Sequence, residues 1–228
     1  MDINELSTLM AVTLGVGWAS GINLYAAVFA LGMAGATGYA DLPASMEVVE
    51  SPWVIAAAGL MYMVEFFADK IPGVDSGWDA IHTFIRIPAG ALLASGMLVD
   101  QGTAMQLAAG LVGGTMAAGS HGTKAGTRAL INTSPEPFTN WTASITEDIS
   151  VFGGIWLMLN HPWVFLGLLV LFVLLSIWLL PKIWRALKTI FRKIRGFFGG
   201  STTEPNIDVI GVNTEPQSAT VSEPGGKG

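Results

Sequence analysis

The sequence predicts an all-α fold, a polytopic transmembrane helical bundle of about six spans. Its 228 residues are 51% hydrophobic and only 12% charged, which is about half the charged fraction of a typical soluble domain. The apolar residues lie in long runs, and the clearest run, residues 163–180, has no charged side chain and is long enough to cross a bilayer. Many of the 28 glycines fall inside these runs, where small residues let membrane helices approach closely.

Turn-forming segments divide the chain into six expected spans and two further regions. The Pro- and Gly-containing segment IPGVDSG separates the second span from the third, and Pro88 inside the third span is expected to kink it. Residues 182–198 are expected to form a basic juxtamembrane amphipathic helix, and residues 199–228 a disordered cytoplasmic tail. The transmembrane domain covers residues 1–182, with spans at approximately 8–36, 53–69, 78–99, 104–131, 140–159 and 163–181.

Lysine and arginine predict the orientation, because the cytoplasmic flanks of membrane helices are rich in both. Six of the eleven cluster at residues 182–195, which places the C-terminus in the cytoplasm. Six spans then place the N-terminus there too, in a multi-pass protein of the cell inner (plasma) membrane. The acidic loop 37–52 falls outside. Residues 1–7 are acidic rather than basic, which argues against a cleaved signal peptide.

Two short sequence matches indicate a 3+3 inverted repeat with broken helices. A Ser-Pro pair begins fourteen residues before Glu65, and another begins fourteen residues before Asp148. Small-residue segments at Ser20–Asn23 and Ser120–Lys124 would be the breaks. Transporters use inverted repeats to build a site near the bilayer midplane. The alternative is that Ser-Pro helix starts and small residues are simply common in membrane proteins.

Charged residues inside the expected spans form the candidate site. The segment EFFADKIPGVDSGWDAIHTFIR, residues 65–86, lies between two apolar runs, and an unpaired charge at the bilayer centre costs about 3 kcal/mol or more. Glu65 and Asp69 are four residues apart and share a helix face. The candidate substrate- or ion-binding residues are Asn23, Glu65, Asp69, Asp79, His82, Arg86, His121, Lys124, Arg128, Glu147 and Asp148.

Acids on the second and fifth spans can pair with cations on the third and fourth. Arg86 and Arg128 are the cations best placed to balance Glu65 and the pair at 147–148. The alternative is that the charges form static ion pairs near the cytoplasmic surface. This interpretation is favoured for the residues that flank the IPGVDSG turn, which are Lys70, Asp75 and Asp79.

The histidines, and the motifs that the sequence lacks, limit the chemistry expected of the candidate site. His82 and His121 stand alone on different spans, and each is a structural histidine, a proton shuttle or a ligand of an unknown metal. The sequence has no cysteine, nucleophile elbow, phosphate loop or HExxH motif, so we expect neither a cofactor nor an enzyme. The expected partners are the lipid bilayer, anionic lipids at Lys182–Arg195, an unknown small solute or ion and a second copy in a homo-oligomer, and not nucleic acid.

Three stretches carry a resemblance to a known family. They are SGINLYAAVFALG, EFFADKIPGVDSGWDAIHTFIRIPAGALLA and INTSPEPFTNWTASITED. With them the sequence resembles the domain of unknown function 4126 family of bacterial membrane proteins, over roughly residues 15–160. The resemblance implies a membrane protein without an assigned activity, and it carries over no catalytic residue and no substrate. The segment beyond about residue 182 looks peculiar to this protein.

These observations predict a small secondary transporter or ion-conducting protein with a charged intramembrane site. The first alternative is a non-transporting membrane scaffold or assembly factor, in which the same charges are fixed ion pairs. A further alternative is an intramembrane enzyme that acts on lipid, for which acids and histidines are available but no recognisable nucleophile arrangement is.

Overall fold

Every element in the computed structural model is helical, over the described residues 2–133 and 137–198. The chain divides into two units, Met1–Phe191 and Arg192–Gly228, and the second is described only at the end of the last helix. The predicted all-α class is confirmed, and the expected tail at 199–228 lies outside the described residues. The elements are α1 (Ile3–Ala36), the 3₁₀ helix η1 (Ala44–Met46), α2 (Glu47–Glu50), α3 (Pro52–Ala68), α4 (Val74–Met97), the 3₁₀ helix η2 (Val99–Gln101), α5 (Thr103–Ile131), α6 (Pro137–Asn160) and α7 (Pro162–Phe198).

Two of the described helices are long and apolar enough to cross a membrane. They are α1 and the stretch Pro162–Ile190 of α7. A third candidate arises if Ala44–Glu50 and Pro52–Ala68, which meet at a bend of 60°, count as one span. Only 17% of the apolar window in Pro162–Ile190 is buried, so this helix turns most of its apolar side chains outward, as a lipid-facing helix does.

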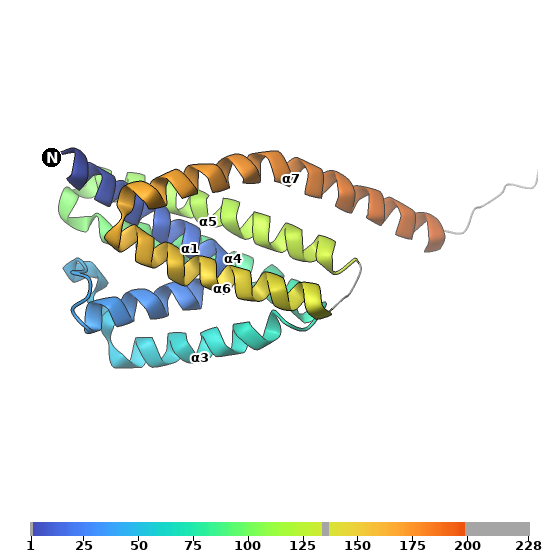
Figure 1. Ribbon diagram of the computed structural model, residues 1–228, viewed down its shortest axis with the longest axis horizontal. Helices are drawn as coiled ribbons and strands as arrows, with labels where there is room; N and C mark the ends of the chain where they lie inside the picture. Colours follow the sequence, from blue (N-terminus) through green and yellow to red (C-terminus); the bar gives the residue numbers. More distant parts are fainter. Residues whose placement is uncertain (1, 134–136, 199–228) are drawn as a thin grey trace, which may run out of the picture. The chain divides into compact units, whose positions relative to one another are not determined.

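Helix α1 is interrupted at Asn23. The backbone of Asn23 leaves the helical region, with φ −148° and ψ 97°. Its side-chain Oδ1 accepts a hydrogen bond from the Ala26 backbone N–H at 3.0 Å, as an N-cap residue does at the start of a helix. Residues 3–22 and residues 24–36 are therefore two helices that meet at Asn23, and Figure 1 shows them as a V in two shades of blue.

Both ends of α1 lie at the same end of the bundle. Asn4, Ser7 and Thr8 line a small cavity together with residues 160–164. The Tyr39 hydroxyl, just beyond α1, donates to Asn160 Oδ1 at 3.0 Å. A straight helix over residues 3–36 would be about 50 Å long and could not bring both ends to one residue. Residues 8–36, which were expected to form a single span, therefore reverse direction at Asn23 as a helical hairpin.

Helices α4 and α5 each bury one stripe, with charged residues at one end and small residues at the other. Spacings of three and four residues keep each stripe on one helix face. A Cβ on Gly113 of α5 would lie 2.9 Å from the Gly90 carbonyl oxygen of α4, and a Cβ on Gly17 of α1 would lie 2.5 Å from the Gly113 carbonyl oxygen. The small residues at these ends therefore let the backbones of α1, α4 and α5 approach closely. The stripes are Asp75, Asp79, His82, Arg86, Gly90, Ala94 and Met97 on α4, and Ala109, Gly113, Ala117, Ser120, His121, Lys124 and Arg128 on α5.

Helices α3 to α7 lie where the other spans were expected, to within a few residues at most ends, and whether each one crosses a membrane stays a prediction. Helix α4 begins at Val74 rather than near Trp78. Gly73 makes the preceding turn with φ 87°, and its N–H donates to Asp75 Oδ1 at 2.9 Å, so the acid holds the turn from inside the helix. Helix α7 contains Pro181 and extends to Phe198, so the span and the basic segment belong to one helix.

The inverted repeat is not confirmed by the helix geometry. The repeat matches the broken segment Ser20–Asn23 of α1 to Ser120–Lys124 of α5. Helix α5 is one continuous helix from Thr103 to Ile131, and α4 likewise continues through Pro88. The break at Asn23 therefore has no counterpart in α5.

Replacing Gly113 with Leu is expected to destabilise the fold, and the same change at Gly119 is expected to leave it stable. A side chain at Gly113 meets Ala94 and the Gly90 carbonyl oxygen of α4, whereas nothing lies within 4 Å of a Cβ on Gly119. Overpacking of a close contact costs about 1–3 kcal/mol. Melting temperatures of the two variants in detergent check this, and equal values would contradict the close approach of α4 and α5.

Candidate functional site

A network of charged side chains lies buried where α3, α4, α5 and α6 meet. At its centre is Glu65 of α3, whose Oε1 accepts hydrogen bonds from Arg86 Nη2 at 2.6 Å and from Lys124 Nζ at 3.1 Å. None of these three side chains is more than 2% exposed. Charges this deeply buried require partners, and Glu65 supplies one to both cations.

Arg86 connects the buried stripe of α4 to α5. Its Nη1 donates to Asp79 Oδ1 at 2.9 Å and lies 3.2 Å from His121 Nδ1. Because a guanidinium only donates, His121 Nδ1 is the acceptor. The neutral His121 ring therefore carries its proton on Nε2, which donates to Thr83 Oγ1 at 2.7 Å.

Lys124 and Arg128 are one turn apart on α5 and link it to α3 and α6. Lys124 Nζ donates to Asp69 Oδ2 at 2.9 Å. Arg128 donates from Nε and Nη2 to the two carboxylate oxygens of Glu147, at 3.1 and 2.7 Å, which is the bidentate geometry that favours arginine. Its Nη1 also donates to the Asp69 carbonyl oxygen at 2.8 Å. The cations of α5 thus tie the ends of two other helices together.

The described part of the site holds more acids than cations. Six carboxylates and four cations leave a formal charge of −2 if all are ionised. Four of the carboxylates also keep one buried oxygen without a hydrogen-bond partner in the described residues. Such oxygens can accept a cation or a proton. The acids are Glu65, Asp69, Asp75, Asp79, Glu147 and Asp148, and the cations are Lys70, Arg86, Lys124 and Arg128.

Asn23 brings the apex of α1 to this site. Its Nδ2 lies 3.4 Å from Asp148 Oδ1, and both side chains are buried. The helix of residues 24–36 begins at Asn23, so the positive end of its dipole lies beside the Asp148 carboxylate. On the other half of α1, the Trp18 carbonyl oxygen accepts a hydrogen bond from Ser120 Oγ at 2.9 Å. Both halves of α1 are therefore held at the apex by other helices.

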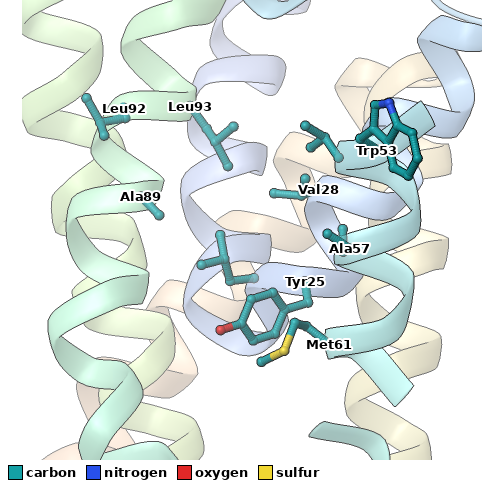
Figure 2. Close-up of a pocket in the computed structure, with 11 residues that line it drawn as sticks. Tyr25, Val28, Trp53, Ala57, Met61, Ala89, Leu92 and Leu93 are labelled. Atoms are coloured by element: carbon teal, nitrogen blue, oxygen red, sulfur yellow. The ribbon is translucent and has the colours of Figure 1, made fainter. Parts of the chain in front are cut away.

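An apolar groove of about 500 Å³ lies between the second half of α1, α3 and α4 (Figure 2). Trp53 and Leu92 line it and are 85% and 73% exposed. Tyr25 also lines it, and its hydroxyl lies 3.0 Å from His82 Nε2. His82 Nδ1 donates to the Trp78 carbonyl oxygen at 2.8 Å, so in a neutral ring Nε2 accepts from the Tyr25 hydroxyl. This hydrogen bond joins the groove to the charged stripe of α4.

Asp75 belongs to the buried site as well as to the turn. Its two carboxylate oxygens accept from Asn132 Nδ2 at 2.7 and 2.9 Å, and Oδ2 lies 4.0 Å from Arg128 Nη1. None of its side chain is exposed. Asp75 is four residues before Asp79, and this spacing on one helix face was the signal that could have placed it in the site.

Lys70 was also assigned to the turn from the sequence, and it is buried. Its Nζ donates to the Phe66 carbonyl oxygen at 2.9 Å and to Ser144 Oγ at 3.2 Å, and it lies over the Phe66 ring. Burial lowers the pKa of the Lys70 ammonium below its usual value of 10.5, against the opposing effect of nearby acids such as Asp148. Neither Lys70 nor Tyr25 had a spacing signal that marked it as part of the site.

The predicted site residues fall into three groups. Asn23 and Asp148 form a separate pair beside the network, and His82 bonds to Tyr25 instead of to a charged residue. Within the described residues, no three His, Asp or Glu side chains converge as metal ligands. A role in binding a solute or ion stays a prediction for all of them. The residues joined in one network are Glu65, Asp69, Asp79, Arg86, His121, Lys124, Arg128 and Glu147.

The helical fold, the helices of spanning length and the apolar surface indicate an all-α membrane protein. The chain matches the family described as domain of unknown function (DUF4126) over residues 10–182, and it belongs to that family. This match confirms the resemblance seen over roughly residues 15–160 and extends it at both ends of that region. No curated protein and no solved structure matches the chain.

Glu65→Gln is expected to destabilise the protein, and adding Arg86→Gln is expected to recover part of the loss, because Asp79 then loses its hydrogen bond from Arg86. Removing one partner of a buried ion pair costs about 3–5 kcal/mol, because the other charge is stranded. Melting temperatures in detergent measure both effects.

The control is Glu65→Gln combined with Arg128→Gln. Arg128 bonds to Glu147 and not to Glu65, so this second change leaves the stranded Arg86 charge in place, removes the two hydrogen bonds to Glu147 and should lower the melting temperature again. Recovery in this control, with none in the Arg86 combination, would show that the pairing is wrong.

Proposed function

We propose that the protein is a small secondary transporter or ion-conducting protein of the inner membrane, with its site at the charged network beside the apex of α1. The observation that carries the proposal is the break at Asn23, 3.4 Å from the buried Asp148. Transporters use broken helices to present helix ends to ions and substrates inside the bilayer. Non-helical backbone is tolerated at that depth only where protein buries it or a cavity meets it.

The topology that fits this proposal has five crossings and one re-entrant hairpin. The basic segment 182–195 lies in the cytoplasm, and α3 to α7 cross in alternating directions. The loop 37–52, Asp100 and Asn160 then lie outside. Because both ends of α1 lie beside Asn160, the N-terminus also lies outside. This topology differs from the six-span prediction only in the first helix and the N-terminus, and it keeps every other loop on its predicted side.

The surplus of negative charge favours ion binding over a purely structural role. Uncompensated carboxylates are costly away from water, and a network that only held helices together would gain nothing from two of them. A cation or proton that binds supplies the missing charge. Its arrival and departure would then change the forces between α3, α4, α5 and α6, which is what a transport cycle requires.

A scaffold or assembly factor is the second candidate, and the quality of the contacts favours it. Arg86 meets Glu65 at 2.6 Å, and Arg128 holds Glu147 through two hydrogen bonds. Fixed pairs of this kind can serve stability alone. In either case we propose that the basic residues of 182–195 bind anionic lipids of the inner leaflet.

The topology predicts that a cysteine at Asn4 is labelled from outside. The chain has no cysteine of its own, so single substitutions report without background. A membrane-impermeant maleimide applied to right-side-out vesicles should label Asn4→Cys, Glu47→Cys and Gln101→Cys. It should label Val74→Cys and Thr133→Cys only after lysis. Protection of Asn4→Cys in intact vesicles would show that the N-terminus lies in the cytoplasm and that the re-entrant hairpin is wrong.

Proteoliposomes that contain the wild-type protein are expected to carry ion flux through the charged site. Gradients of H⁺, Na⁺ and K⁺ are the probes, followed with pH-sensitive and voltage-sensitive dyes. The double variant Glu65→Gln/Arg86→Gln leaves the net charge unchanged, so it should insert and fold but lose most of the flux.

The control is Asp100→Asn, in the exposed turn between α4 and α5, which should keep wild-type flux. Wild-type flux no greater than that of protein-free vesicles under every gradient would reject transport in favour of the scaffold.

A further inference from the structure

Asp148 differs from the other acids of the site because it has no cation partner. Each of the other five has a Lys or Arg nitrogen within 4.0 Å. Among the described residues Asp148 has none, and its Oδ2 has no hydrogen-bond partner. Only 8% of Asp148 is exposed. A carboxylate in such a position is costly as an anion, and protonation removes that cost.

The groups around Asp148 include two cations, and one of them is not committed to another acid. Lys124 already bonds to Glu65 and Asp69. Lys70 bonds to Ser144 Oγ, and Ser144 is one helical turn before Asp148 on the same face of α6. The polar and titratable groups that face Asp148 are Asn23 from α1, Tyr62 from α3, Asp69 and Lys70 from the turn after α3, Lys124 from α5 and Glu147 from α6 itself.

We propose that Asp148 carries the coupling ion of the transport cycle as an exchangeable proton, and that Lys70 moves from Ser144 to pair with the carboxylate when the proton leaves. The proposal rests on the proposed function and names its ion. In the step, the O–H bond of Asp148 breaks, the electron pair stays on the carboxylate oxygen and the proton passes to water. The Lys70 ammonium then supplies the positive charge that the proton took away.

A proton fits this position better than a metal ion. A hard cation such as Ca²⁺ takes six to eight oxygen ligands. Asp148 has one neighbouring amide, Asn23, and the described residues contain no convergent set of His, Asp and Glu ligands. A proton needs only one oxygen, and Asp148 Oδ2 is free to take it.

The same proton would act on the apex of α1. Asn23 Nδ2 donates to Asp148 Oδ1, and a hydrogen bond to a charged carboxylate is roughly twice as strong as one to a neutral group. Loss of the proton therefore tightens the hold of α6 on Asn23, and its return loosens it. The broken helix is thus the element that responds to the protonation state of Asp148.

Infrared titration of the full-length purified protein tests the proton directly. The wild-type protein should show the C=O band of a buried carboxylic acid that fades as pH rises and shifts in D₂O. Asp148→Asn, which keeps the shape and the bond to Asn23, should lose this band, and the exposed-site control Asp100→Asn should keep it. Lys70→Gln should move the midpoint of the titration to higher pH, because the anion loses its partner.

A wild-type protein without such a band, a band that persists in Asp148→Asn, or a Lys70→Gln midpoint equal to the wild-type value would each overturn the proposal. The Lys70 measurement decides the question even if Asp148→Asn fails to fold.

Flux in proteoliposomes separates this proposal from the proposed function. A band assigned to Asp148 in a protein without flux leaves the proton site standing and rejects transport. Flux that is equally dependent on pH in the wild type and in Asp148→Asn keeps transport and rejects Asp148 as the carrier. If wild-type flux responds to a pH gradient and flux in Asp148→Asn does not, both transport and the role of Asp148 as the proton carrier are supported.

Discussion

The constraint on which the structure depends is the pairing of Glu65 with Arg86 and Lys124, whose side chains are all buried. The three partners come from three different helices, so none of these helices can leave the bundle without stranding a charge in an apolar medium. The glycines at the other end of α4 and α5 serve the same constraint. Contacts such as Gly90 with Gly113 let the two backbones approach, which brings their charged ends within reach of one acid.

The break in α1 places a helix end next to the charged network. A continuous helix would present only side chains to α6, whereas Asn23 presents a helix N-terminus and an amide beside Asp148. On another side of the second half of α1, the apolar groove is lined by Tyr25, which is hydrogen-bonded to His82. One short helix, residues 24–36, together with its first residue Asn23, therefore contacts an apolar groove, a hydrogen-bonded Tyr–His pair and a buried acid. A shift of that helix would change all three of these contacts.

Residue spacing predicted the helices and their charged faces, because positions three and four apart share a helix face in any fold. It did not decide which arginine holds Glu65, since Arg86 and Arg128 have equal periodicity and differ only in how the helices pack. The small-residue segment Ser20–Asn23 indicated a break in the first helix, but the sequence did not indicate that the chain reverses there, because residues 8–36 have the length and composition of one long span. Lys70 flanks a Pro-Gly turn, as exposed residues do, and is buried only because α6 packs over it through Ser144.

The long interval between Asn23 and Asp148 has a consequence for how the protein is made. The two residues are 125 positions apart, and the Ser120 hydroxyl that holds Trp18 follows it by 102 positions. Chains are synthesised from the N-terminus, and contacts between distant residues form late. The first helix to leave the ribosome is therefore among the last to find its partners. Until α5 and α6 have been inserted, the polar apex of α1 lacks both, and a chain truncated before Asp148 leaves the broken helix exposed to lipid and to quality-control proteases.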